Sequence, residues 1–155
     1  MTRRTLVLIA AGGSFLLLAA AFAFQALGYA PCKLCLWQRW PHGAAITLGA
    51  LALVLPWPIL LWGGMAAALT TAGIGLYHAG VEYKFWAGPS SCSGGGSLDL
   101  GAMSGADLLS TDGPTGVVMC DQVAWAFAGL SMASWNALFS FGLALIWLAA
   151  LRARP

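Results

Sequence analysis

Two cysteines separated by two residues, Cys32 and Cys35, are the side chains of this sequence best suited to chemistry. Such a pair closes a small ring, so it can switch between a dithiol and a disulfide with little backbone movement. If the chain is helical from Cys35 onward, Arg39 and His42 follow at i+4 and i+7 and share one stripe with the thiol. A positive charge and a helix N-terminus both favour the thiolate. The pattern therefore predicts a redox site.

A metal half-site, or two inert buried cysteines, would be the alternative explanations of the pair. A zinc site would need a second pair of ligands. The other cysteines, Cys92 and Cys120, lack that spacing, and both histidines border apolar runs. We therefore expect no metal and favour redox chemistry.

The composition is that of a membrane protein. The 155 residues are 60% hydrophobic and 8% charged, with a mean hydropathy of +0.82. A net charge of +2 provides no basic face for nucleic acid, so that class of partner is excluded. The four cysteines lie in polar stretches outside the apolar runs. This placement indicates an oxidising, extracytoplasmic compartment.

We expect an all-α membrane protein with one integral domain over residues 1–155, a bundle of four transmembrane helices in the lipid bilayer. The predicted spans cover residues 5–27, 36–55, 59–78 and 126–151. Two extracytoplasmic loops, at residues 28–35 and 79–125, would carry the cysteines. A cleaved signal peptide would also begin with basic residues and an apolar run, but the first run is too long for one.

Pro41 leaves two ways to draw the second helix. The helix either starts near Trp40 and is short, or starts near Cys35 and bends at the proline. We favour the second, because residues 43–55 alone are too short to span a bilayer.

Basic residues flank both ends of the chain: Arg3 and Arg4 precede the first span, and Arg152 and Arg154 follow the last. Cytoplasmic segments carry an excess of arginine and lysine, so both termini should be cytoplasmic. With an even number of spans, both cysteine loops then face the opposite side.

Several polar residues stand at the outer ends of the predicted spans. His78 and Glu82 lie one helical turn apart and would form either an interfacial cap or a proton-handling pair. Asn136 is expected to hydrogen-bond between helices. Cys92 and Cys120 bracket a glycine-rich excursion, where a disulfide between them would be either structural or a reactant.

These motifs together resemble the DsbB family of bacterial membrane disulfide-forming proteins. The first-loop motif of that family is similar to Pro-Cys-Lys-Leu-Cys-Leu-Trp-Gln-Arg-Trp-Pro-His at 31–42. The second loop is similar to Tyr-His-Ala-Gly-Val-Glu at 77–82, Gly-Pro-Ser-Ser-Cys at 88–92 and Cys-Asp at 120–121. The Trp-Asn pair at 135–136 adds to the likeness, which extends over nearly the whole chain.

The resemblance implies a quinone-dependent thiol oxidase of the bacterial inner membrane, with both cysteine loops periplasmic. Its partner would be a periplasmic thioredoxin-fold dithiol oxidase (DsbA-like), and ubiquinone or menaquinone would accept the electrons. Arg39 matches the quinone-site arginine of the family, and His78 lies near its third-helix histidine. His42, on the stripe of Cys35, joins this candidate quinone-binding set. Gln38 stands where some members carry glutamate.

The resemblance also implies an order for four catalytic cysteines. Cys92 would form the mixed disulfide with the partner, and Cys120 would be its pair. Cys32 would exchange with that pair, which leaves Cys35 as the thiolate facing the quinone.

Two other functions compete with this interpretation. One is a quinone-linked redox protein similar to vitamin K epoxide reductase, although the active Cys-x-x-Cys of that type lies elsewhere in the chain. The other is a non-enzymatic membrane scaffold with structural disulfides, which would resist the mild reduction that catalytic disulfides yield to.

Overall fold

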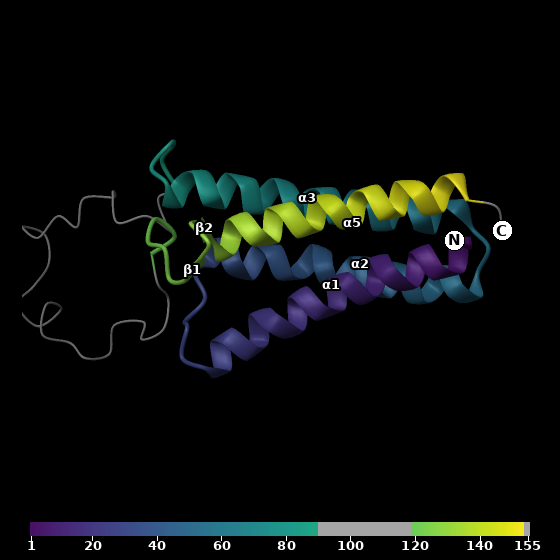
Figure 1. Cartoon of the computed structure of the whole chain (residues 1–155), viewed down its shortest axis with the longest axis horizontal. Coiled ribbons are helices and arrows are strands. Elements are labelled where there is room, and N and C mark those ends of the chain that lie inside the picture. Colours follow the sequence, from purple (N-terminus) through teal and green to yellow (C-terminus); the bar gives the residue numbers. More distant parts are fainter. Residues whose placement is uncertain (90–118, 154–155) are drawn as a thin grey trace, which may run out of the picture.

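The computed structural model of the chain describes residues 1–89 and 119–153. In these residues it contains four helices, α1 (Arg3–Ala26), α2 (Lys33–Val54), α3 (Pro58–Glu82) and α5 (Met132–Arg152). Two short strands, β1 (Ala126–Phe127) and β2 (Leu130–Ser131), form an antiparallel hairpin. Figure 1 shows a helical bundle with both termini at one end and the hairpin at the other. A mostly helical fold is therefore confirmed.

Helix α1 ends at a glycine for a stereochemical reason. Gly28 adopts a φ of 98°, a left-handed conformation that only glycine takes without strain. The amides of Gly28 and Tyr29 turn back to the carbonyls of Gln25 and Phe24, at 3.1 Å each, and so satisfy the last turn. The chain then crosses to α2 within a few residues.

Helix α2 begins with a cysteine as its N-cap. The Sγ of Cys32 accepts a hydrogen bond from the backbone N–H of Cys35 at 3.2 Å, in the place usually taken by a serine or aspartate oxygen. The helix continues through Pro41 to Val54. It therefore starts two residues before Cys35 and includes the proline, so the short helix starting near Trp40 is excluded.

Helix α3 starts at a proline and ends without a glycine. Pro58 fits the first turn because its missing N–H would have had no partner there. At the other end Lys84 takes a φ of 61°, and the amide of Phe85 bonds the Gly80 carbonyl at 2.8 Å. The helix thus extends to Glu82, four residues beyond the predicted end at 78, and the last turn carries His78 and Glu82 together.

The last helix starts later than predicted. Residues 126–131, expected to belong to the span 126–151, form the hairpin instead, and α5 begins at Met132. Ala128 and Gly129 both have positive φ, as a two-residue hairpin turn requires. Ser131 caps α5 by accepting from the Ser134 amide at 3.2 Å. Tyr83 fixes the hairpin to the end of α3 by donating to the Gly129 carbonyl at 3.1 Å.

The end of the bundle that holds the termini is packed through small residues around Trp147. This side chain is 0% exposed, and a Cβ added to Gly64 would lie 2.6 Å from its ring. Gly49 of α2 lies against Ala11 of α1 in the same layer. Arg3 also donates to the carbonyl of Ala153 at 2.8 Å, which joins the two ends of the chain. Close helix approach through glycine and alanine is typical of membrane bundles.

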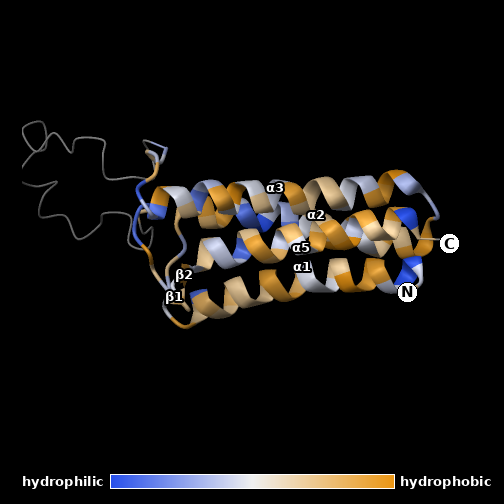
Figure 2. Ribbon diagram, turned by 45° about the horizontal axis from the view of Figure 1, so that its top comes forward, coloured by the Kyte–Doolittle hydropathy of each residue, from blue (hydrophilic) through white to orange (hydrophobic). Residues whose placement is uncertain are grey.

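Three of the helices in the described residues, α1, α3 and α5, are long and apolar enough to cross a membrane. Their outer faces are hydrophobic over most of their length, as Figure 2 shows. Helix α2 is not in this group, because its first half contains Lys33, Gln38, Arg39 and His42. The protein is therefore an integral membrane protein, and the fourth span remains a prediction.

Candidate functional site

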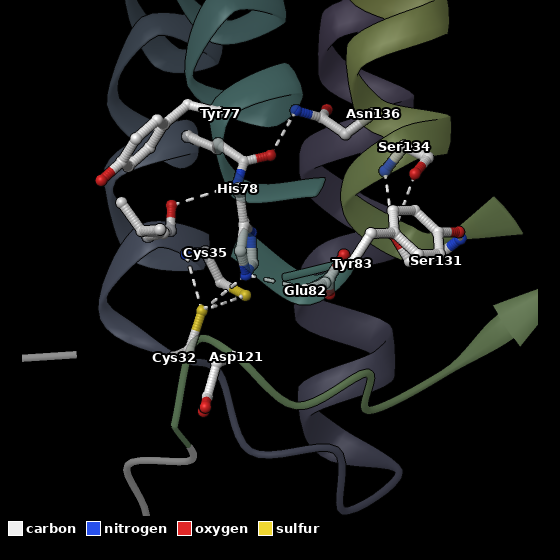
Figure 3. A network of polar contacts seen from close by, with 12 residues as sticks. Cys32, Cys35, Tyr77, His78, Glu82, Tyr83, Asp121, Ser131, Ser134 and Asn136 are labelled. Atoms are coloured by element: carbon white, nitrogen blue, oxygen red, sulfur yellow. Dashed lines mark hydrogen bonds and ion pairs between the residues drawn. The ribbon is translucent and has the colours of Figure 1, made fainter. Parts of the chain in front are cut away.

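The two cysteines of the Cys-x-x-Cys motif face each other at the start of α2 as free thiols. The S–H of Cys32 donates to the sulfur of Cys35 at 2.8 Å (Figure 3). The pKa of Cys32 is raised above its ordinary value, first because of this hydrogen bond to Cys35 and second because of burial. The proton of the pair therefore stays on Cys32, which leaves Cys35 as the sulfur better able to carry negative charge.

His78 of α3 approaches this pair from the side (Figure 3). Its Nε2 lies 3.4 Å from the Sγ of Cys32, and the ring is buried with an exposure of 3%. One helical turn later, Glu82 places Oε1 at 3.8 Å from the same nitrogen. His78 is thus in contact with both a thiol and a carboxylate.

Gln38 connects this histidine to the rest of α2. Its side-chain amide nitrogen lies 3.1 Å from the Leu34 carbonyl and 3.0 Å from Nδ1 of His78. Its carbonyl oxygen accepts a hydrogen bond from Asn136 at 2.6 Å. A single buried amide therefore joins α2, α3 and α5 directly beneath the cysteines.

Asn136 extends the network deeper into the bundle. Its Oδ1 accepts from the Nε2–H of His42 at 2.9 Å, and its Nδ2 donates to Thr71 at 3.2 Å. Thr71 in turn donates to the backbone carbonyl of Gln38 at 3.3 Å. The predicted interhelical hydrogen bonding of Asn136 is therefore present. Polar side chains that satisfy one another in this way are tolerated inside a membrane bundle.

Arg39 points away from this network and toward α1. It donates to the side chain of Gln25 at 2.7 Å and to the Ala21 carbonyl at 3.4 Å, and it stacks on Phe22 with 4.6 Å between guanidinium carbon and ring centroid. Its Nε is buried and has no hydrogen-bond partner. The arginine therefore keeps one buried donor unused.

A cavity of about 360 Å³ lies between α1 and the other helices, at the end of the bundle that carries the cysteines. Figure 1 shows α1 diverging from its neighbours toward this end. Most of the lining is apolar and comes from α1, α5 and the segment before α5. The polar residues of the wall are those of the site: Cys32, Cys35, Gln38, Arg39, His42, His78, Glu82, Gln122 and Asn136.

The second cysteine-bearing segment packs onto the first. Cys120, which is 0% exposed and disulfide-bonded, forms one buried cluster with Cys32, Leu34 and Val81. The next residue, Asp121, is held by Lys84, whose ammonium donates to its carboxylate at 2.7 Å and to its carbonyl at 2.9 Å. The pKa of Asp121 is lowered by this hydrogen bond from Lys84. Three of the four cysteines thus meet at one place.

Cys32, Cys35 and His78 also have the residue types of a metal site. Their ligand atoms lie within 4.8 Å of one another. A metal at Nε2 would need that nitrogen to be unprotonated, which requires a proton on Nδ1. The amide nitrogen of Gln38 faces Nδ1 and can only donate to it. The donor set therefore fits a thiol–imidazole contact better than a metal.

Five of the residues predicted for the site, Cys32, Cys35, Arg39, His42 and His78, line one cavity. Cys120 lies against them, whereas Cys92 is outside the described residues. The sequence analysis did not identify Thr71, and it gave Gln38 no contact. A glutamine three residues after a cysteine, in an otherwise apolar helix, was the signal available for Gln38.

Comparisons with known proteins agree with this arrangement. The family model "Disulfide bond formation protein DsbB" matches residues 3–150. Disulfide bond formation protein B of Dechloromonas aromatica (strain RCB) is 34% identical over 134 residues, covering 82% of this chain and 79% of the relative. The protein of that name from Aeromonas hydrophila subsp. hydrophila is 30% identical, with 83% and 75% covered. The one from Polaromonas sp. is 26% identical, with 96% and 89% covered.

No solved structure matches the chain. The family model nevertheless covers almost the whole sequence, including the Cys-x-x-Cys pair, His78 and Cys120. The protein belongs to the DsbB family of disulfide bond formation proteins.

Proposed function

We propose that this protein is a quinone-dependent membrane thiol oxidase that reoxidises a periplasmic thioredoxin-fold dithiol protein. The observation that carries the proposal is the shared wall of one apolar cavity, where Cys35 lies among Arg39, His42 and His78. A thiol pair and a lipid-accessible redox partner must meet in such a place. The cavity lies at the end of the bundle where Cys120 is also buried.

The cavity suits a quinone in shape and in polar groups. Its apolar walls match a hydrophobic ring, and three buried polar atoms of its lining residues lack hydrogen-bond partners: Nε of Arg39, Nδ1 of His42 and Oε2 of Glu82. The first is a donor for a carbonyl oxygen, and the second is an acceptor for a hydroxyl group. A bound quinone would accept two electrons and two protons to become the quinol.

A strong acceptor is needed because the soluble partner is itself a strong oxidant. DsbA-type proteins have potentials of about −120 mV, and each deficit of about 30 mV in a two-electron acceptor costs about 1.4 kcal/mol. A membrane quinone supplies this driving force, which a glutathione pool would not. Turnover assays with ubiquinone and with menaquinone would identify which of the two quinones accepts the electrons.

The contacts of the cysteines support the order of exchange. Cys32 is buried in one cluster with Cys120, whereas Cys35 lies at the edge of that cluster, so we assign the exchange with the second-loop disulfide to the sulfur of Cys32. Cys35 is only partly buried and lies on the cavity wall. The first partner thiol would attack the second-loop disulfide, form the mixed disulfide at Cys92 and release the Cys120 thiolate. The second partner thiol would then displace Cys92, so two partner thiols become a disulfide. The Cys120 thiolate would attack Cys32 of an oxidised Cys32–Cys35 pair, so two electrons pass to the Cys35 thiolate.

Coupled turnover tests the function as a whole. Purified protein should oxidise a reduced thioredoxin-fold dithiol protein while the absorbance of added ubiquinone or menaquinone is bleached, one quinone for each disulfide formed. Oxidation of the partner without loss of quinone would refute the quinone assignment.

Trapping tests the order of the cysteines. In Cys120→Ser the free Cys92 thiolate should attack the disulfide of the oxidised partner, and the mixed disulfide should accumulate at Cys92 because no Cys120 thiol remains to displace the partner. Mass mapping that finds this adduct at Cys32 would show that the relay enters through the first loop instead.

The orientation in the membrane is part of the proposal. Arg3 and Ala153 are in contact at the end opposite the cysteines, so one topology places both termini on one side and both cysteine segments on the other. We propose that the termini are cytoplasmic and the cysteines periplasmic. Membrane-impermeant labelling of Ser97→Cys in intact spheroplasts should succeed; labelling only after the inner face is opened would reverse this orientation.

A further inference from the structure

The direction of the hydrogen bonds beneath the cysteines is set by one backbone carbonyl. The oxygen of Leu34 can only accept, so the atom of Gln38 that lies 3.1 Å away must be its NH₂ group. The same NH₂ group lies 3.0 Å from Nδ1 of His78. The two N–H bonds of this nitrogen can serve both partners, and the carbonyl of Leu34 excludes the amide oxygen from this position.

The other side of the Gln38 amide agrees with this orientation. Its Oε1 lies 2.6 Å from Nδ2 of Asn136, which is a donor there because Oδ1 of Asn136 accepts from Ser140 at 3.5 Å. Asn136 also contacts His42 through that same oxygen at 2.9 Å. The two amides therefore hold each other in one orientation, from α5 through α2 to α3.

The tautomer of His78 follows from this orientation. Nδ1 faces a donor, so it is the unprotonated nitrogen, and the proton of the neutral ring is on Nε2. Sγ of Cys32 lies 3.4 Å from this Nε2, Oε1 of Glu82 is farther away at 3.8 Å, and the backbone of Cys120 is a further partner of the ring. Cys32 in turn donates its own proton to Cys35 at 2.8 Å. The hydrogen bonds thus run in one direction, from His78 through Cys32 to Cys35.

We propose that Gln38 is a positioning residue that fixes His78 in the Nε2–H tautomer, so that the ring donates to Cys32 and thereby keeps the Cys32 proton directed at Cys35. Asn136 is the residue that holds Gln38 in place. No proton is transferred in this arrangement; the ring supplies a hydrogen bond. If Nε2 were unprotonated, it would accept the Cys32 proton, and Cys35 would lose the donor that stabilises its thiolate.

The tautomer itself is independent of the electron acceptor, whereas its benefit to turnover rests on the proposed function. The protein contains only two histidines, so ¹⁵N-histidine labelling of the reduced, full-length protein in detergent gives two rings to assign. We expect long-range ¹H–¹⁵N correlations to show His78 with a protonated Nε2 and a bare Nδ1. A protonated Nδ1 on His78 in the unmodified protein would overturn the proposal.

Gln38→Glu should reverse the tautomer of His78. A carboxylate has no hydrogen to give, so it accepts from Nδ1, and the His78 proton should move to that nitrogen. His42 is an internal control, because its Nε2–H donates to Asn136 and should keep its tautomer. An unchanged His78 ring in folded Gln38→Glu protein would also overturn the proposal.

Alkylation of the reduced cysteines gives a second measurement. In Gln38→Leu the ring is free to change tautomer, and iodoacetamide labelling of Cys35 at neutral pH should slow about tenfold, the size expected when a charged acceptor loses a hydrogen bond. Arg39 and Glu82, the charged side chains that line the same cavity as Cys35, are unchanged in this variant. Thr47→Ala removes an exposed hydroxyl from the same helix that bonds only the Gly43 carbonyl, and should label like the unmodified protein.

Equal labelling rates in Gln38→Leu and Thr47→Ala would count against the role of Gln38. Failure of quinone bleaching with the expected tautomer intact would instead refute the proposed function and leave the tautomer assignment standing.

Discussion

The two ends of the bundle use opposite ways of bringing helices together. At the end that holds the termini, glycines let backbones approach around a fully buried Trp147. At the cysteine end, α1 diverges and a cavity of about 360 Å³ remains, with buried polar side chains on its wall. One end is closed by small residues and dispersion contacts, and the other is held by hydrogen bonds.

The same helices therefore provide packing stability at one end and the polar site at the other. Apolar packing needs no water and no polar partner, so it can anchor the helices at membrane depth. A redox site needs polar groups and access, which tight packing would exclude. The closed end therefore fixes the helices that the open end uses, and substitutions at the two ends should affect different measurements.

The largest effect is expected for Cys35→Ser at the open end. Removing a reacting sulfur should lower coupled quinone reduction by roughly a thousandfold or more. Thermal unfolding should change little, because Cys35 is not part of the Trp147 cluster. Quinone bleaching and an unfolding curve measured on the same preparation test both statements. Residual turnover within tenfold of the unmodified protein would remove Cys35 from the relay.

Arg39→Leu should separate the two half-reactions at the open end. The variant loses the donors on the cavity wall, so quinone reduction should fall by about a hundredfold, as when one stabilising donor is removed from an active site. Thiol exchange with the partner should fall much less. Gln25→Leu is the matched control: it removes only the side-chain oxygen to which Arg39 donates at 2.7 Å, and it should lower quinone reduction less. Equal losses in both half-reactions would indicate a folding defect.

The sequence predicted the parts of this arrangement that depend on local pattern. Hydropathy located the helices, and the spacing of Cys35, Arg39 and His42 predicted one shared stripe; in the structure all three line one cavity. The pattern did not place Arg39 against α1, because the direction of a long side chain depends on the neighbouring helix. It also gave no reason for Gln38 and Thr71 to meet Asn136 across three helices.

The boundaries that differed from prediction have a common cause. Lys84 ends α3 in a left-handed conformation where glycine is the usual signal, so the helix end was not visible in the sequence. The turn at Ala128–Gly129 likewise has an alanine at a position of positive φ where glycine, asparagine or aspartate is usual. The hairpin was therefore not visible in the sequence, and residues 126–131 were assigned to the last span. In both places tertiary contacts, such as the hydrogen bond from Tyr83 to Gly129, hold the unusual backbone.

At the closed end, Gly64→Ala should destabilise the fold. The new Cβ would lie 2.6 Å from the Trp147 ring, which has no space to move, so we expect a loss of about 1–3 kcal/mol in the free energy of unfolding. Gly73→Ala is the matched control on the same helix, since nothing lies within 4 Å of its Cβ position, and it should be neutral or stabilising by up to about 1 kcal/mol. Equal stabilities of the two variants would mean that the Trp147 layer is not tightly packed.

The smallest effect is expected where Lys84 holds the segment after Cys120. Lys84→Ala removes both hydrogen bonds to Asp121, so the buried Cys120 disulfide should be reduced by a phosphine about two- to fivefold faster at neutral pH, the range typical of an exposed ion pair. Asp121→Asn keeps the bond to the backbone carbonyl and should have a smaller effect. Because Lys84 lowers the pKa of Asp121 from its ordinary 3.8, the ion pair contributes above that pH and is lost as the pH falls through the lowered value.

The reduction rate of the unmodified protein should therefore approach that of Asp121→Asn in strong acid, while the two differ at neutral pH. A phosphine reductant is suitable because it remains active in acid. Lys84→Ala should stay faster than both across this pH range, since it also lacks the bond from the ammonium to the Asp121 carbonyl. If Asp121→Asn and Lys84→Ala reduce at the same rate, the carboxylate supplies the whole effect, and the backbone bond adds nothing to the hold on Cys120.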